Sequence, residues 1–196
     1  NGTLIFGQVV ITENDFIDVG DTVRLSFSTD FNIDYSTTGA NVLWDFSNLV
    51  ANNQELIEPL NVMSGGIIIL NRFGPTAGAY SSDHYNNFTG IPFDQFGGFL
   101  PLNIEEVYRF TRNRSDAQRF TGLSLKVDGV EIGFRSDTIE KVYEFPLNFG
   151  DNYSSVGYTN IDFNPLADIF FKQYRKRNST VDGHGTLITP YGTFDV

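Results

Sequence analysis

The sequence contains no cysteine, which excludes disulfide scaffolds, thiolate metal sites and thiol nucleophiles in a single step. It also lacks a long apolar run: the longest covers about residues 67–70, whereas a membrane-spanning helix needs roughly 20 apolar residues. Positive charge is scarce, because 13 Lys and Arg stand against 24 Asp and Glu and leave a net charge of −11. Such a charge repels phosphate backbones and anionic lipids. We therefore expect neither a nucleic-acid partner nor insertion into a membrane.

Aromatic residues and glycine are abundant instead. The chain has 19 Phe, 9 Tyr and 19 Gly, a composition typical of half-buried strands separated by turns. Residues 22–30 alternate between apolar and polar side chains as a half-buried strand does, and Asp128-Gly129 is a strong hairpin signal. We expect one all-β domain over residues 1–196, a β-sandwich of jelly-roll type. Because the sequence stops inside a strand pattern at Val196, we also expect a longer protein.

The expected strands are separated by short turn-rich segments and cover residues 4–11, 22–30, 42–46, 56–63, 67–70, 106–113, 118–127, 130–134, 139–147, 154–163, 169–177 and 186–194. Residues 47–54 are expected to form the one short helix. Residues 71–101 lack a clear period and scatter aromatic residues among Gly, Pro and Asn, which is typical of a functional or poorly ordered loop. We place the binding site in this loop, at Tyr80, Asp83, His84 and Tyr85, where rings for stacking stand beside hydrogen-bonding groups. The alternative is that the loop folds its phenylalanines over one end of the core.

Catalytic patterns are absent from the sequence. Only two histidines occur, His84 and His184, and no Gly-x-Ser-x-Gly elbow frames a serine nucleophile. Glu105 and Glu106 are adjacent, so in a strand they would point to opposite faces and could not flank one glycosidic bond. The Glu-x-Asp-x-x-Glu pattern of laminarinase-like jelly rolls is missing, as are the Arg, Gln and His strand motifs of alginate-lyase-like ones. No catalytic residue is predicted.

Oxygen ligands for calcium stand at alternate positions in three places, of which residues 30–34, with Asp30, Asn32 and Asp34, are the clearest. None of these segments has the glycine and glutamate of an EF-hand loop. The favoured interpretation is Asx turns that cap strand ends. We therefore expect no cofactor, with calcium as the alternative.

Two further features have a structural and a functional interpretation. The basic cluster of Lys172, Arg175, Lys176 and Arg177 is expected to be a solvated strand face, with an anion site as the alternative. Trp44, the only tryptophan, is expected to anchor its strand in the core because Leu43 and Phe46 flank it. Its alternative role is a platform on which a sugar stacks.

Four segments carry a resemblance to a known group. They are residues 11–22 (Ile-Thr-Glu-Asn-Asp-Phe, then Val-Gly-Asp-Thr), 39–49 (Gly-x-Asn-x-x-Trp-Asp-Phe-Ser-x-Leu), 141–151 (with Tyr-x-Phe-Pro-Leu-x-Phe-Gly-Asp) and 181–194 (Val-Asp-Gly-His-Gly-Thr-Leu-Ile-Thr-Pro-Tyr-Gly-Thr-Phe). Their order and spacing resemble the uncharacterised N-terminal β domains of proteins that Bacteroidota export by the type IX secretion system. His184 stands where that group has an aromatic residue.

The resemblance implies a secreted or cell-surface location, the type IX secretion machinery as a partner during export, and a C-terminal sorting domain beyond these residues. It implies no activity. In Bacteroidota, O-linked glycans are attached to a hydroxyl that follows Asp and precedes a small or aliphatic residue. Thr22 in Asp21-Thr22-Val23 and Thr138 in Asp137-Thr138-Ile139 fit this pattern.

These observations predict a non-enzymatic surface module that adheres to, or binds, a glycan or a partner protein. A passive secretion cargo without a ligand is a second possibility. The alternative from another class is a jelly-roll hydrolase or lyase that acts on a polysaccharide.

Overall fold

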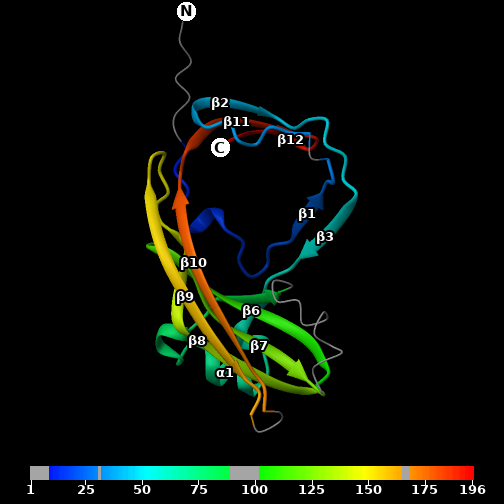
Figure 1. Cartoon of the computed structure of the whole chain (residues 1–196), viewed down its shortest axis with the longest axis vertical. Coiled ribbons are helices and arrows are strands. Elements are labelled where there is room, and N and C mark those ends of the chain that lie inside the picture. Colours follow the sequence, from blue (N-terminus) through cyan, green and yellow to red (C-terminus); the bar gives the residue numbers. More distant parts are fainter. Residues whose placement is uncertain (1–8, 31, 89–101, 165–167) are drawn as a thin grey trace, which may run out of the picture.

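The computed structural model describes residues 9–30, 32–88, 102–164 and 168–196, and these form mostly strands with one short α-helix. Figure 1 shows a large sheet that carries the helix at one end of the molecule and a smaller sheet at the other end. The all-β, sandwich-like fold expected from the sequence is confirmed. The only α-helix among the described residues has seven residues, so no helix in these ranges is long enough to cross a bilayer.

The large sheet has seven strands in the order β10-β9-β8-β7-β6-β5-β4. Every pair is antiparallel; short turns join β6 to β7 and β7 to β8, whereas residues 62–83, which include the α-helix, connect β4 to β5. The strands are β4 (Leu60–Asn61), β5 (His84–Asn87), β6 (Ile104–Arg114), β7 (Ala117–Val127), β8 (Val130–Glu144), β9 (Asn152–Asp162) and β10 (Phe170–Thr180).

The turn between β7 and β8 is the predicted Asp128-Gly129 hairpin. Asp128 has φ 48° and Gly129 has φ 80°, as a two-residue turn of type I′ requires. This turn pairs Val127 with Val130 and fixes the register of the two long strands. Register shifts near Phe120 and Gly122 then bend β7 against β8.

Two buried clusters lie in the large sheet. The first contains Phe120, Leu123, Leu125, Phe134 and Ile161 with their neighbours from β7, β8 and β9. The second lies where α1 (Ile67–Phe73) covers the sheet, and its centre is the stacked pair Phe73 and Phe110, with ring centroids 3.8 Å apart. Nearly every residue of β7 is therefore buried, because the strand has a hydrophobic layer on each face.

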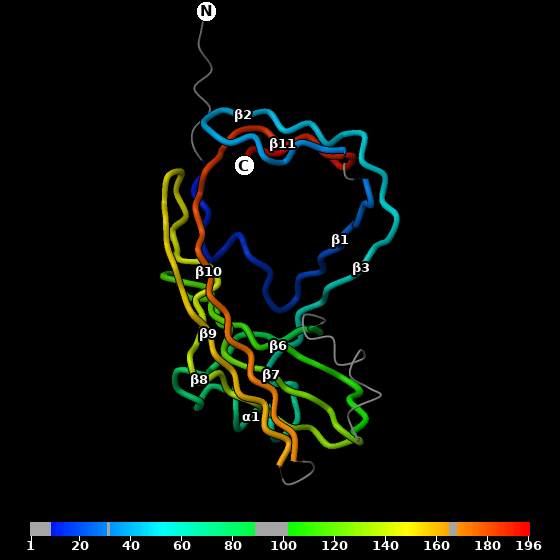
Figure 2. The backbone as a smooth tube through the Cα atoms, viewed as in Figure 1, coloured from blue at the N-terminus to red at the C-terminus, as the bar shows by residue number. Residues whose placement is uncertain are grey.

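Two smaller sheets complete the described chain. One joins β1 (Val23–Phe27) to β3 (Asn53–Ile57), and the other has the order β12-β11-β2, from β12 (Gly192–Asp195), β11 (Gly183–Thr189) and β2 (Gly39–Asp45). In Figure 2 the chain enters the large sheet through β3 along one side and leaves it through β10 along the other. No residue of these five strands is fully buried. The hydrophobic stabilisation of the fold is therefore concentrated in the large sheet.

The pairing of β11 with β2 joins two segments that the resemblance singled out, residues 39–49 and 181–194. It is parallel, and the backbones approach so closely that a Cβ on Gly185 would lie 1.9 Å from the carbonyl oxygen of Val42. Glycine at this position is thus a requirement of the strand pairing.

Five sequence predictions about secondary structure were wrong. Residues 56–63 and 186–194 were each predicted as one strand, but the first is divided between β3, β4 and a 3-10 helix (Val62–Ser64), and the second between β11 and β12. Residues 67–70 form the start of helix α1 rather than a strand, because Ile69 and Phe73 lie four residues apart and bury the same helix face. A short apolar run cannot distinguish these two structures. Residues 47–54 form a turn and the start of β3, not a helix. Residues 130–147, predicted as two strands, contain the single long strand β8.

Trp44 is not the core anchor that the sequence predicted. It is half-buried and lies outside both buried clusters. Its indole N–H donates to the carbonyl of Thr37 at 3.0 Å, and its ring lies against Gly183. Because the small sheet has no opposing layer among the described residues, an aromatic side chain on β2 finds only a loop and a neighbouring strand to cover it.

Candidate functional site

A pocket of about 370 Å³ opens on the face of the large sheet that does not carry α1. The volume is within the range of small-ligand sites. The N-terminal segment before β1, which includes the 3-10 helix η1 (Glu13–Asp15), forms one wall, and β1 and β3 contribute Val23, Leu25 and Ile57. The floor comes from four strands of the large sheet and consists of His84, Asn86, Arg109, Thr111, Gln118, Val142 and Tyr143. We call the face of the large sheet that forms this floor the pocket face.

His84 lies at the bottom of this pocket and is 2% exposed. Its Nδ1 makes no hydrogen bond to any described residue, and the carboxylate of Asp18 is 3.6 Å away. Burial is the main cause that lowers the pKa of His84 below its usual value of 6.5, against the opposing effects of Asp18 and Asp83. Burial therefore favours the neutral imidazole, whose Nδ1 faces the Asp18 carboxylate.

Arg109 is the cation of the pocket. Among the described residues it forms no hydrogen bond and no ion pair, and its Nε is buried without a partner. Its guanidinium lies 5.3 Å from the ring centroid of Phe120 and 5.9 Å from that of Phe88, which are cation–π distances. Burial, together with nearby Arg175 and Arg177, lowers the pKa of Arg109. Glu140 acts on this pKa in the opposite direction, but no ion pair among the described residues neutralises the positive charge of Arg109.

The neighbouring guanidinium groups share a single buried carboxylate. Glu140 on β8 is 2% exposed and accepts from Arg175 Nε at 2.5 Å and from Arg177 Nε at 3.0 Å. It reaches these β10 side chains across β9 at Gly157, where a Cβ would lie 2.8 Å from the Glu140 Cβ. The guanidinium of Arg175 lies 4.2 Å from the Phe120 centroid, so Arg109 and Arg175 contact the same ring. Among the described residues, Glu140 is therefore the one buried carboxylate near the guanidinium groups of Arg175 and Arg177, which it pairs with, and of Arg109, on which it acts at longer range.

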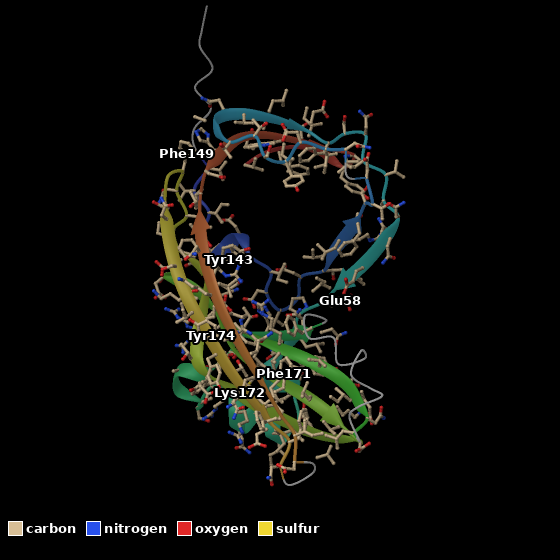
Figure 3. All side chains as sticks on the ribbon, viewed as in Figure 1. Glu58, Tyr143, Phe149, Phe171, Lys172 and Tyr174 are labelled. Carbon is tan, nitrogen blue, oxygen red and sulfur yellow. The ribbon has the colours of Figure 1, made fainter. Side chains whose placement is uncertain are left out.

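The remaining pocket residues offer one aromatic wall and several neutral hydrogen-bonding groups. The rings of Tyr143 and Phe16 lie 4.8 Å apart, and Figure 3 shows Tyr143 next to the N-terminal segment. Asn86, Thr111 and Gln118 line the same pocket and donate or accept hydrogen bonds without carrying charge. An aromatic wall with neutral polar groups and one unpaired cation suits a polar, hydroxyl-rich ligand better than an apolar one.

The structure separates the four residues that the sequence proposed as a binding site. Only His84 lines the pocket. Tyr85 is 7% exposed and stacks on Phe110 in the cluster beneath α1, on the opposite face of β5. Tyr80 lies over the guanidinium of Arg135 at 4.7 Å, and Asp83 is occupied by an ion pair with Arg114 at 2.7 Å. The segment of residues 71–101, predicted as one loop, therefore contains strand β5 (His84–Asn87) of the large sheet. Residues 89–101 lie outside the described ranges.

The basic cluster on β10 is divided by strand alternation. Arg175 and Arg177 are half-buried on the side of Glu140, whereas Lys172 and Lys176 are exposed. The prediction of a solvated face holds for the lysines, whereas the Arg175 side chain is only 22% exposed and the Arg177 side chain, 39% exposed, pairs with the same carboxylate. Their spacing of two residues placed both on one strand face, and this signal was available in the sequence.

The oxygen-rich segment at residues 30–34 forms Asx turns. Asp30 accepts from the backbone N–H of Asn32, and Asp34 accepts from the backbone N–H and hydroxyl of Ser36. These hydrogen bonds lower the pKa of Asp34. Among the described residues, no group of three or more His, Asp or Glu side chains is arranged to hold a metal ion.

The two threonines of the modification pattern are both exposed. Thr22 directly precedes β1, as expected for a turn-to-strand junction. Thr138 lies inside β8, opposite Tyr158 of β9. Attachment of an O-linked glycan at either hydroxyl stays a prediction.

Comparisons with protein-family models, with curated proteins and with solved structures find no match for this chain. The resemblance to type IX secretion cargo therefore stays a prediction, and the interpretation of the pocket depends on its own geometry.

The buried, neutral state of His84 predicts a loss of stability in mild acid. In the unfolded chain His84 takes up a proton near pH 6.5, whereas in the folded chain burial opposes this protonation. The stability that the neutral His84 contributes to the fold is therefore present above pH 6.5 and decreases as the pH falls below that value. Urea unfolding of the wild type should therefore show a decrease in unfolding free energy between neutral pH and about pH 5. His84→Gln should weaken this decrease, and His184→Gln should keep it. Equal pH profiles for the wild type and His84→Gln would contradict the assignment.

Proposed function

We propose that this chain is a non-enzymatic binding module that takes part of a glycan into the pocket on the pocket face. The observation that carries the proposal is the combination of two buried nitrogen atoms, Nδ1 of His84 and Nε of Arg109, neither hydrogen-bonded to a described residue, in a pocket with an aromatic wall. Buried polar groups ordinarily have partners, so groups left without one are candidates for contact with a ligand or ordered water. The location that goes with this function is the cell surface, after export by the type IX secretion machinery, as the sequence resemblance implies.

A glycan array with the full chain tests this function. We expect one class of glycan to bind, and we expect Tyr143→Ala together with Asn86→Ala to weaken that binding about tenfold or more, since each removes a pocket contact. Leu43→Ala is the control, because Leu43 is exposed on β2, remote from the pocket residues. An array without any binding glycan, or binding that the pocket variants leave unchanged, would contradict the proposal.

A lyase is the second candidate, and one observation favours it. The pocket brings together His84, Arg109, Gln118 and Tyr143 from four strands, which are side chains of the kinds that eliminate across a uronate glycosidic bond. In that reaction a neutral His removes the C5 proton, the C4–O bond breaks as a C4–C5 double bond forms, and a Tyr hydroxyl protonates the leaving oxygen. Arg109 would stabilise the charge that develops on the carboxylate.

Ultraviolet absorbance of unsaturated uronate distinguishes the two candidates. A binding module leaves the absorbance of a uronate polysaccharide unchanged. Turnover that is lost in Tyr143→Phe, while binding is retained, would replace the binding function with the lyase function.

A further inference from the structure

We infer that the ligand is an acidic sugar, a uronate, whose carboxylate binds Arg109 at the floor of the pocket; this inference rests on the proposed binding function. Three observations support it: the positive charge gathered around Arg109, the absence of a hydrogen-bonding partner for Arg109 among the described residues, and the carboxylates on the N-terminal wall of the pocket.

Positive charge gathers around Arg109, which is unusual for this protein. The chain as a whole has a net charge of −11. Around Arg109, however, the side chains of Arg175 and Arg177 lie close enough to lower its pKa, and both pair with Glu140, whereas Arg109, which is partly buried, forms no ion pair among the described residues. A buried cation without a counterion costs free energy, because it has lost its water and gained no opposite charge. An anionic group delivered by a ligand would remove that cost.

Arg109 is the guanidinium that remains available to such a group. Nε of Arg175 and Nε of Arg177 both donate to Glu140, whereas Arg109 has cation–π contacts and no hydrogen bond within the described residues. A guanidinium presents its N–H groups in a planar fork that matches the two oxygens of a carboxylate. The residue at the floor is thus suited to recognising a carboxylate.

The rim has the opposite charge. Exposed Asp15 lines the pocket wall, and Asp18, whose side chain is 64% exposed, lies on the same N-terminal segment but does not line the pocket. A ligand that is anionic throughout, such as a polyphosphate, would be repelled by these carboxylates. A uronate residue has one carboxylate and several hydroxyl groups, so its acid can meet Arg109 while its hydroxyls donate to the rim carboxylates. The aromatic pair of Tyr143 and Phe16 offers an apolar surface for the sugar ring.

Calorimetric titration with matched sugars tests the inference. The probes are trigalacturonate and trimannuronate, the methyl esters of both, and sodium acetate as a free carboxylate. We expect at least one acid to bind about tenfold or more tightly than its ester, because the ester keeps the size and loses the charge-assisted hydrogen bonds. Acetate should bind far more weakly than the sugar acid, since it lacks the ring and the hydroxyls.

Variants test whether Arg109 causes the preference for the sugar acid over its methyl ester. Arg109→Gln should remove the difference between acid and ester, and Arg109→Lys should retain part of it, because lysine keeps the charge and loses the fork. Lys176→Gln is the matched control: it removes the same charge from an exposed position next to Arg175. Circular dichroism and thermal melting establish that each variant is folded. If Arg109→Gln does not fold, the wild-type comparison of acid with ester and the Arg109→Lys result still decide the inference.

The outcomes separate the inference from the function on which it rests. Equal affinity for acid and ester, with binding still lost in Tyr143→Ala, would overturn the uronate inference and leave the binding function intact. A preference that Lys176→Gln removes as fully as Arg109→Gln would also overturn it, because it would reflect surface charge. No binding of any sugar would overturn the inference together with the proposed function.

Discussion

Replacing Glu140 by glutamine should destabilise the fold by about 3–5 kcal/mol, the cost of leaving a buried ion pair without one partner. Glu140 is 2% exposed and is the shared acceptor of Arg175 and Arg177. Glutamine keeps the shape of the side chain but leaves three guanidinium groups without a buried counter-charge. Urea unfolding monitored by circular dichroism measures the change.

Glu144→Gln on the same strand is the control for this experiment. Glu144 pairs with Lys141 at 3.0 Å, but both side chains are more than a third exposed, so the loss should be at most about 1 kcal/mol. Adding Arg109→Gln to Glu140→Gln should recover part of the lost stability, because it removes one of the repelling charges. A loss below about 1 kcal/mol in Glu140→Gln would show that the guanidinium groups do not depend on this carboxylate.

Replacing Gly122 by alanine should cost about 3 kcal/mol, at the upper end of what overpacking usually costs. A Cβ at this position would lie 2.3 Å from the carbonyl oxygen of Phe134 and 2.7 Å from the ring of Phe73. The carbonyl belongs to the neighbouring strand β8, so it cannot turn away without disturbing the sheet. The added methyl group must therefore separate β7 from β8 or lift α1 from the sheet.

Gly133→Ala provides the comparison on the adjacent strand. There the nearest atom to a new Cβ is Cγ of Arg72 at 3.0 Å, on a flexible side chain that can move, and we expect a cost below about 1 kcal/mol. The difference between the two alanine variants is measured as a shift in thermal midpoint. If both variants melt at the same temperature, α1 does not pack on β7 as described.

Local signals in the sequence were sufficient for much of the large sheet. The Asp128-Gly129 turn and the alternating segments around it predicted β6, β7 and the start of β8 close to their observed bounds, because turn chemistry and side-chain period are local properties. Helix α1 was missed, since a run of four apolar residues has no period that distinguishes a helix from a strand. Its helical state depends on Phe73 packing against Phe110, a contact made across the fold.

The pocket could not be predicted from the sequence, because it also depends on contacts made across the fold. His84, Arg109 and Tyr143 lie on three strands and meet only through the pairing of those strands, which includes register shifts within β6, β7 and β8. A shift of one residue moves a side chain to the opposite face of a sheet. The sequence therefore indicated His84 as a candidate, but it could not show that Tyr85 lies on the other face or that Arg109 lies nearby.

The most direct test of the account follows the Nε–H signal of Arg109 by nuclear magnetic resonance. The arginine signals of the full chain are assigned with single Arg→Lys variants and then recorded during titration with trigalacturonate and trimannuronate. The account predicts that the Arg109 signal shifts with saturating behaviour as an acidic sugar fills the pocket, while the signal of Arg24 on β1 stays in place. A titration that shifts Arg24 and the surface lysines but leaves Arg109 unchanged would contradict it.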